Sequence, residues 1–313
     1  MDKILILDCT GNDWTDNHLR RLDKVDVEAI YKQVGIFLRI IRRIHYKTRI
    51  PFKHIWYGGW LERLTEYKVI IIFQSLFGNE IFGYIRNRGY DGRLICYYRD
   101  TQDMKWIREG CHADELKALR DDVELWTFDG EDAENYGMRY NPQFYFEIAG
   151  DKPHKIKYDA IFIGAAHSRE KEINGIYNKL KSKCLMLNFI VQHDEKYRPK
   201  KINGINYITN NMDYEQIIHA NCQSRCIVEI MNGKQQGMTV RALEALFLRC
   251  KLITNNIAIK EMDFYHPDNI FIDGVDDWDE ILGWLKRPFR EIPLNIRNEY
   301  LASRWLERFF INN

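Results

Sequence analysis

Short runs of apolar residues, separated by segments of helical periodicity, are the feature that most limits how this chain can fold. In the first half these runs are Ile4–Leu7, Val69–Phe73, Leu94–Tyr98 and Val123–Phe128. Continuous β-branched and aromatic runs of this length favour strands covered on both faces, as in parallel sheets. A helical pattern at Gly78–Asn87 lies between two of the runs, so the sequence predicts βαβ units.

The alternation restarts after a polar segment with Gly and Pro turn formers, Gly150–Lys155. The later strand patterns are Tyr158–Gly164, Cys184–Val191, Tyr207–Thr209, Cys226–Ile230, Lys251–Thr254 and Ile270–Ile272, with helical patterns at Ser168–Ser182 and Thr239–Leu248. A chain of 313 residues has room for two cores. We predict an α/β protein with two Rossmann-like domains facing each other across a cleft, residues 1–150 and 151–293. A C-terminal helix over residues 294–313 could pack back on the first domain. Ligands of open α/β sheets bind outside the carboxyl ends of the strands.

Composition narrows the class of protein. The formal net charge of +1 gives no reason to expect a nucleic-acid partner. The seven cysteines are scattered without metal-ligand spacing, so we expect free thiols in a reducing compartment and no metal centre. No signal peptide is visible, and every apolar stretch is far shorter than the roughly 20 residues that span a bilayer. The expected location is the cytoplasm.

The most informative segment runs from Ile227 to Asn255, where a strand leads through a glycine turn into a helix. The first-turn N–H groups of a helix lack intrahelical partners, and the helix dipole favours an anion there. A diphosphate would therefore suit the turn formed by Gly237, Met238, Thr239 and Val240, where Thr239 can also cap the helix. Glu244, five residues into the helix, could accept hydrogen bonds from a ribose diol. This prediction requires the Glu244 carboxylate to be accessible.

The segment that begins this helix reads Gln236-Gly237-Met238-Thr239-Val240-Arg241-Ala242-Leu243-Glu244-Ala245-Leu246. It resembles the donor-binding signature of GT-B glycosyltransferases. It is also similar to bacterial glycosyltransferases of capsule and lipopolysaccharide assembly. Their first domain carries a run like Trp126–Asp129, Asp132-Ala133, Tyr136-Gly137 and Tyr140–Tyr145. The two matching segments span about 50 residues; the rest of the chain matches only in architecture.

The resemblance implies roles for individual residues. Glu244 would hold the ribose, and Gln236 would contact the transferred sugar. Related retaining enzymes carry an acid at the place of Gln236, so the stereochemical course stays open. In the family an Arg and a Lys after the first strand of the second domain contact the diphosphate. Here Gly164 is followed by Arg169 and Lys171, of which Lys171 is equally well explained as surface charge. Cations at this place would stabilise the leaving nucleotide.

The strand ends of the first domain should supply the acceptor side and any base. Candidates lie at Asp8–Asp13, Gln74-Ser75 and Arg99-Asp100. An inverting enzyme needs a carboxylate or a His near the acceptor hydroxyl. Asp13 and Asp100 are the residues we select, although either could instead be a helix N-cap. His167 is a weaker choice.

A basic amphipathic pattern covers residues 36–53. Ile36, Ile40, Ile41 and Ile44 recur at helical spacing, and Arg39, Arg42, Arg43 and Lys47 flank them. Such a helix can lie on an anionic membrane, for example at the inner face of the plasma membrane. The alternative is a helix that packs its apolar stripe on a core and exposes its basic face.

Together these features predict a metal-independent glycosyltransferase without a bound cofactor. It would move a sugar from a nucleoside-diphosphate sugar to a glycan or lipid-linked acceptor in bacterial surface polysaccharide synthesis. Two alternatives stay open: a nucleotide-sugar epimerase of the same fold, and a non-catalytic sugar-nucleotide-binding protein. A dinucleotide-dependent oxidoreductase is disfavoured, because Cys9-Thr10-Gly11-Asn12 has one glycine where that fingerprint needs three.

Overall fold

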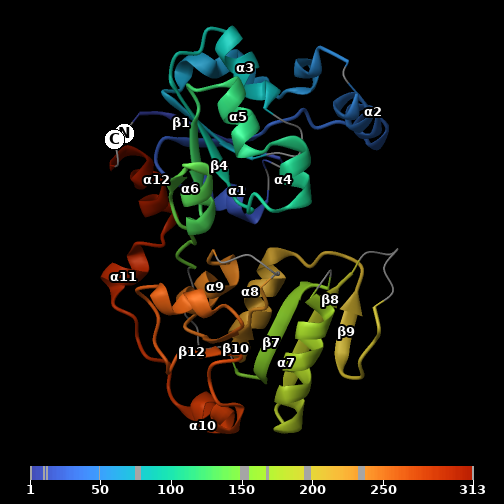
Figure 1. Ribbon diagram of the computed structural model, residues 1–313, viewed down its shortest axis with the longest axis vertical. Coiled ribbons are helices and arrows are strands. Elements are labelled where there is room, and N and C mark those ends of the chain that lie inside the picture. Colours follow the sequence, from blue (N-terminus) through green and yellow to red (C-terminus); the bar gives the residue numbers. More distant parts are fainter. Residues whose placement is uncertain are drawn as a thin grey trace. The chain divides into compact units, whose positions relative to one another are not determined.

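The fold is described from a computed structural model of the chain. It describes residues 2–9, 11, 13–48, 50–74, 79–148, 155–166, 169–193, 199–231 and 237–311. The chain divides into two compact units, Met1–Pro142 and Gln143–Asn313. The division falls a few residues before the predicted linker, of which residues 150–154 lie outside the described part. Figure 1 shows both units coloured along the sequence.

Unit 1 contains a six-stranded sheet in the order β2-β1-β3-β4-β5-β6, in which every pairing is parallel. Its strands are β1 (Ile4–Asp8), β2 (Val25–Ala29), β3 (Val69–Phe73), β4 (Arg93–Tyr98), β5 (Glu124–Thr127) and β6 (Arg139–Tyr140). Its helices are α1 (Trp14–Leu19), α2 (Ile36–Lys47), α3 (Glu80–Asn87), α4 (Lys105–Gly110), α5 (Ala113–Leu119) and α6 (Gly130–Tyr136), with 3-10 turns η1 (Lys53–Trp56) and η2 (Gly59–Glu66).

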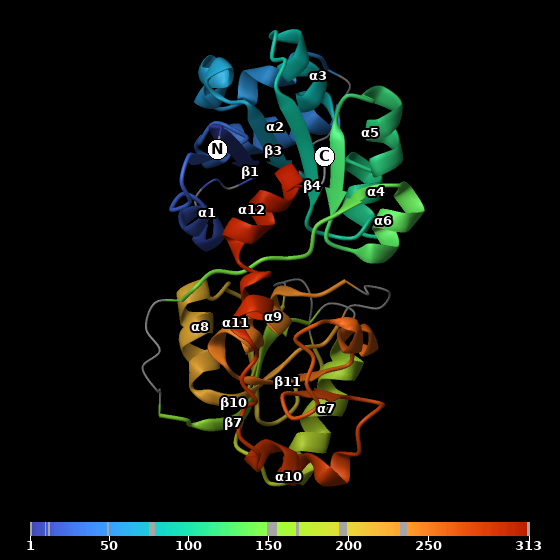
Figure 2. The same ribbon diagram turned by 90° about the vertical axis from the view of Figure 1, so that its left-hand side faces the viewer.

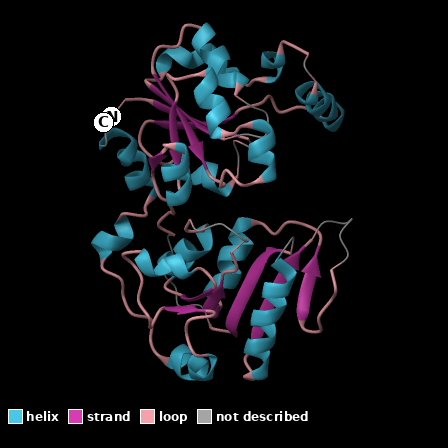
Figure 3. Ribbon diagram, in the orientation of Figure 1, coloured by secondary structure: helices cyan, strands magenta, loops and turns pink. Residues whose placement is uncertain are grey.

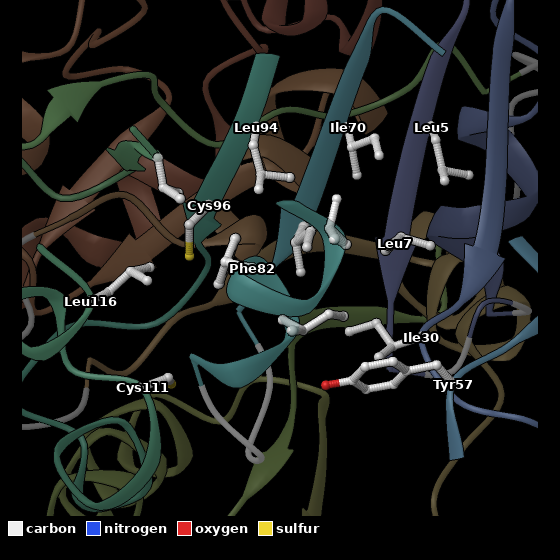
Figure 4. Close-up of a cluster of buried hydrophobic side chains, with 14 of the residues drawn as sticks. Leu5, Leu7, Ile30, Tyr57, Ile70, Phe82, Leu94, Cys96, Cys111 and Leu116 are labelled. Atoms are coloured by element: carbon white, nitrogen blue, oxygen red, sulfur yellow. The ribbon is translucent and has the colours of Figure 1, made fainter. Parts of the chain in front are cut away.

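The central strands of unit 1 are buried on both faces, as their uninterrupted apolar runs predicted. Leu5, Ile70, Leu94 and neighbouring side chains on one face pack against Phe82 of α3 in a single cluster (Figure 4). Helices lie along the strands in Figure 3. Because β1, β3 and β4 are parallel neighbours, their carboxyl ends lie at the same edge of the sheet. Side chains cover both faces of these strands and support that edge.

Unit 2 contains a second all-parallel sheet of six strands, in the order β12-β11-β10-β7-β8-β9. Its strands are β7 (Tyr158–Ala165), β8 (Leu187–Gln192), β9 (Ile205–Ile208), β10 (Ser224–Val228), β11 (Lys251–Thr254) and β12 (Ile270–Ile272). Its helices are α7 (Glu170–Ser182), α8 (Tyr214–Cys222), α9 (Val240–Leu248), α10 (Ile281–Lys286), α11 (Leu294–Asn298) and α12 (Ala302–Ile311), with 3-10 turns η4 (Ile257–Glu261) and η5 (Trp278–Glu280).

Unit 2 brings its first and last residues together. Tyr145 forms a parallel bridge with Leu301: its N–H donates to Tyr300 O at 2.8 Å, and its C=O accepts from Ala302 N–H at 2.8 Å. The Phe144 ring lies 4.3 Å from the Trp305 ring of α12. Figure 2 shows this C-terminal segment as the red helices α11 and α12. The helix expected over 294–313 is thus two helices, separated at residues 299–301; its packing on the first domain stays a prediction.

The stripe of isoleucines on α2 is exposed, which corrects one of its two interpretations. Ile36, Ile40, Ile41 and Ile44 are all solvent-exposed, and Tyr46 is the buried residue of this helix. The core-packed interpretation was wrong because the helix is attached through its other side. There Tyr46 and Arg42 meet the ring of Tyr31, before α2, and His45 accepts a hydrogen bond from Trp56 of η1. None of the helices in the described ranges is long and apolar enough to span a bilayer.

Candidate active site

The carboxyl ends of two neighbouring strands in unit 2, β7 and β10, meet the start of α9. The two strands pair in parallel, with Ile161 opposite Ile227. As predicted, Thr239 caps the helix: its Oγ1 accepts the N–H of Arg241 at 3.1 Å. The Thr239 hydroxyl also donates to the carboxylate of Glu229, which Thr254 Oγ1 contacts at 2.5 Å. Buried hydrogen bonds therefore fix where α9 begins at this edge.

Two guanidinium groups lie over the same strand ends. Arg169, just before α7, donates from Nη1 to Ile230 O at 2.6 Å and from Nη2 to Ala165 O at 2.8 Å. Arg241 donates from Nη2 to Ile163 O at 3.0 Å. Both groups thus bind carbonyls near the carboxyl end of β7, although they come from helices far apart in the sequence. Each is only partly buried, so the pair reaches the surface of the edge.

Electrostatics shows that the two guanidinium groups affect each other. Burial lowers the pKa of Arg169, and the nearby charge of Arg241 lowers it further, against the opposing effect of Glu229. Burial would also lower the pKa of Arg241, but the adjacent Glu244 carboxylate outweighs that effect and the pKa is raised. Arginine stays charged throughout the physiological range. Two like charges held together in this way favour an anion with several oxygens, because guanidinium groups match phosphate geometry.

Glu244 does not lie where the sequence analysis required it. Its side chain is 1% exposed and forms an ion pair with Arg241. Its Oε1 accepts from Tyr214 Oη at 2.5 Å, and its Oε2 accepts from Asn221 Nδ2 at 2.8 Å. The expected ribose contact is therefore corrected: α8 packs against α9 and supplies partners to both oxygens. In this structure Glu244 is a buried counter-ion that orients Arg241.

The other residues that were predicted to bind the donor differ in how deeply they are buried. Gly237 and Met238 are buried, whereas Val240 and Gly164 are half-buried. Gly164 sits on β7, and a Cβ added there would lie 3.6 Å from Arg169 Nη2. Lys171 is exposed in the first turn of α7, as its surface-charge interpretation predicted. Gln236 and His167 lie outside the described residues.

The corresponding edge of unit 1 is acidic. Asp8, the last residue of β1, accepts the N–H of Cys9 at 2.6 Å and lies 3.4 Å from Arg99 Nη1. The N–H of Arg99 in turn donates to Gln74 Oε1 at 2.6 Å, which joins the ends of β1, β3 and β4. Burial raises the pKa of Asp8, and Arg99 opposes the rise.

The two predicted base residues differ in environment. Asp13 is the N-cap of α1 in a capping box: its Oδ1 accepts from Asp16 N–H at 2.8 Å, and its own N–H donates to Asp16 Oδ2 at 3.0 Å. Its N-cap interpretation is thus confirmed. Asp100 caps no described helix, since the next helix begins at Lys105 after Met104. Burial raises the pKa of Asp100 and Arg99 lowers it in part. The role of Asp100 as a base stays a prediction.

Three carboxyl groups gather at this edge; the sequence indicated Asp8 and Asp13 as candidates but not Asp16. Within the part of the chain that the structure describes, oxygens of Asp8, Asp13 and Asp16 lie within 4.8 Å of one another. Each has a structural task, either in the capping box or beside Arg99.

The segment of unit 1 that resembles the family also has a structural role. Asp129 caps α6 by accepting the N–H of Asp132 at 3.1 Å, and Asp132 Oδ2 accepts the N–H of Gln102 at 2.8 Å. Burial raises the pKa of Asp132 to about 6.

The role of Arg241 and its support from Tyr214 and Asn221 were not predicted from the sequence. A signal was present, because Arg241 stands one turn before Glu244 on the same helix, a spacing that pairs opposite charges. The helix that carries Tyr214 and Asn221 was not predicted, and no local pattern tells that it packs on α9.

No protein-family model and no curated protein matches the chain. Solved structures do match over nearly its whole length. An α,α-trehalose-phosphate synthase (UDP-forming) from Burkholderia vietnamiensis is similar with a TM-score of 0.57 and 9% identity, over 99% of this chain and 96% of that one. An α-glucosyltransferase in complex with UDP and DNA is similar with a TM-score of 0.53 and 10% identity, over 98% and 92%. The chain therefore shares the α/β fold of these GT-B glycosyltransferases, with two parallel six-stranded sheets.

Proposed function

We propose that this protein is a glycosyltransferase that moves a sugar from a nucleoside-diphosphate sugar to an acceptor hydroxyl. The observation that carries the proposal is the pair of guanidinium groups, Arg169 and Arg241, over the carboxyl ends of β7 and β10. The fold adds support, because the similar proteins named above form UDP or are bound to it. We infer a donor site in unit 2 with the diphosphate on the two arginines.

The chemistry follows from those groups. The acceptor oxygen attacks the anomeric carbon of the donor sugar, and the bond from that carbon to the diphosphate oxygen breaks. The leaving nucleoside diphosphate gains negative charge, which Arg169 and Arg241 stabilise as preorganised donors. Asp100 is our choice for the base that takes the acceptor proton, since its raised pKa brings it nearer to the operating pH.

The finer assignments rest on sequence resemblance. We propose a glycan or lipid-linked acceptor in bacterial surface polysaccharide synthesis, because the segments around Gln236–Leu246 and Trp126–Tyr145 resemble enzymes of that class. We also propose catalysis without a metal ion, with arginine supplying the positive charge. Nucleic acid is not the acceptor that we expect, although one similar structure holds DNA.

Thermal shift with UDP, GDP, ADP and CDP tests the donor site, since a bound ligand stabilises the folded state by mass action. One diphosphate should raise the melting temperature clearly more than the others and more than inorganic phosphate. Arg169→Gln should abolish that rise, and Lys171→Gln, a nearby exposed cation, should keep it. Absence of any shift in the intact protein would contradict the proposal.

Turnover then separates the remaining functions. Sugar consumption that depends on an added acceptor identifies a transferase. Conversion of the donor sugar without an acceptor would instead identify an epimerase. Binding with neither reaction, across a broad set of acceptors, would identify a non-catalytic binding protein.

A further inference from the structure

Helix α2 and the segment after it carry a series of large apolar side chains that are exposed. Ile36 is 72% exposed, Phe37 73% and Ile44 58%, and the exposed series continues with Ile50 and Phe52 beyond the helix. Soluble proteins rarely keep so many large apolar side chains together in water without a binding role. Figure 1 shows α2 standing away from the sheet of unit 1.

The orientation of α2 is fixed by contacts on its other side. Arg42 lies over the Tyr31 ring at 4.8 Å and donates from Nη1 to Lys32 O at 3.2 Å. His45 Nδ1 accepts from Trp56 Nε1 at 2.9 Å, and Tyr46 is buried beside Tyr31. The helix is therefore anchored through polar and aromatic side chains, and its apolar face points outward. A surface helix of a globular protein normally does the reverse.

A row of positive charge borders the apolar face. Arg39, Arg43 and Lys47 are spaced every four residues, which places them along one flank of the helix. All three are exposed, and no described acidic side chain lies within ion-pair distance of them. Between Glu28 and Glu62 the sequence contains no acidic residue. The surface that complements this flank must carry negative charge.

The segment after the helix keeps one aromatic side chain outward at a conformational cost. Phe52 has φ 69° and ψ 29°, in the left-handed region that bulky residues avoid, and its side chain is 68% exposed. Its neighbours hold it there, since Lys53 pairs with Glu80 at 2.7 Å and His45 Nε2 lies 2.9 Å from Pro51 O.

We propose that α2 and Phe52 form a docking surface for a membrane rich in anionic lipids. The apolar face would enter the boundary between headgroups and acyl chains, and Arg39, Arg43 and Lys47 would meet the headgroup phosphates. With residues Ile36–Lys47 the helix is too short to cross a bilayer, so it lies along the surface. A bilayer accepts an exposed amphipathic helix without a shaped pocket, whereas a protein partner must supply a matching groove. The inference is independent of the donor site in unit 2.

Vesicle co-sedimentation tests the surface, with the intact protein and vesicles of phosphatidylcholine alone or with phosphatidylglycerol added. We expect binding to the mixed vesicles, weakening as salt rises, and little binding to phosphatidylcholine alone. The charge variant Arg39→Gln/Arg43→Gln/Lys47→Gln should lose roughly a hundredfold in affinity, about fivefold for each cation. The apolar variant Ile36→Ser/Phe37→Ser/Ile44→Ser should also lose binding, although its charge is unchanged.

Matched controls change the same residue types elsewhere. Leu119→Ser with Leu294→Ser removes two large apolar side chains that are 66% and 64% exposed, and Lys201→Gln/Lys260→Gln/Lys286→Gln removes three exposed cations. Both controls should bind mixed vesicles like the parent, and circular dichroism should show every variant folded. Equal binding to both vesicle types, or binding that neither α2 variant reduces, would overturn the proposal. So would a failure to bind any vesicle, including a result in which α2 instead mediates self-association or captures an acidic protein.

Discussion

The two parallel sheets present opposite chemistry at the same structural place. At the carboxyl edge of unit 1, Asp8 and Asp100 are buried enough to have raised pKa values. At the carboxyl edge of unit 2, Arg169 and Arg241 form a cationic pair over β7 and β10. One architecture therefore places buried carboxyl groups at the strand ends of one unit and a pair of guanidinium groups at the strand ends of the other. The backbone determines where functional groups gather, and the residue types at the strand ends determine which group they bind.

The largest expected effect concerns the acidic edge. Asp100→Asn should lower kcat by roughly 10²- to 10⁴-fold, as expected for loss of a general base. Because the pKa of Asp100 is raised, the rate should fall with decreasing pH at a higher pH than an ordinary aspartate would give. The Asp100→Asn variant should lack this acid limb of the pH–rate profile. A pH–rate profile of both proteins measures this. An unchanged kcat would remove Asp100 from the mechanism.

Stability supplies an independent check on Asp100. A carboxyl with a raised folded-state pKa binds its proton more tightly in the folded state, so its contribution to stability falls as pH rises from its unfolded to its folded pKa. At neutral pH the Asp100→Asn protein should therefore melt no lower than the parent. A large loss of activity together with unchanged stability would distinguish a base from a structural residue.

The cationic edge should give the next largest effect. Arg169→Gln should weaken nucleoside-diphosphate binding roughly ten- to a hundredfold, the usual effect of losing a hydrogen bond to a charged group. Isothermal titration calorimetry measures the Kd. Lys171→Gln serves as the control, because it removes an exposed cation from the same segment. Similar losses in both variants would mean that general charge, and not the arginine pair, attracts the ligand.

The buried pair between Glu244 and Arg241 should affect both stability and binding. Glu244→Gln should cost about 1–3 kcal/mol in the free energy of unfolding, since it leaves the partly buried guanidinium of Arg241 without its counter-ion. Chemical denaturation measures this loss. If Glu244 orients Arg241, the variant should weaken the binding of inorganic pyrophosphate and the binding of the nucleoside diphosphate to a similar extent. A loss of affinity for the nucleoside diphosphate alone would indicate that Glu244 contacts the ribose directly.

The smallest effect is expected at Asp13. Removing its side chain in Asp13→Ala should cost about 1 kcal/mol through the lost N-cap of α1, with catalysis largely retained. Thermal unfolding and kcat, measured on the same preparation, test this. A loss of turnover comparable to that of Asp100→Asn would give the acidic edge a second catalytic carboxylate.

Strand patterns in the sequence predicted most of the architecture. Val69–Phe73, Lys251–Thr254 and Ile270–Ile272 were predicted with the bounds that the structure gives them. Two strands were missed for physical reasons. Val25–Ala29 alternates apolar and acidic residues, and Arg139–Tyr140 is too short and polar to show a pattern. Both are edge strands of the sheet, where less of the strand is buried and the residue type is therefore less restricted.

The candidate site was harder to predict than the fold. The capping role of Thr239 and the placement of Arg169 could be inferred locally, because both depend on a helix start after a strand. The burial of Glu244 depends on Tyr214 and Asn221, which reach it from a different helix. The direction of the α2 stripe likewise depends on Tyr31 and Trp56, which hold the other face. Such contacts between distant segments leave no trace in local periodicity.

The bridge between Tyr145 and Leu301 has a consequence for how unit 2 is made. Its first segment is paired with its last, so the unit cannot close during synthesis until residue 301 has left the ribosome. Long-range pairing of this kind slows folding and prolongs exposure of unfinished strands. A chain cut short before α12 should therefore leave Phe144 and Tyr145 uncovered and be prone to aggregate, whereas unit 1, whose strands end by Tyr140, has all of its sheet available much earlier.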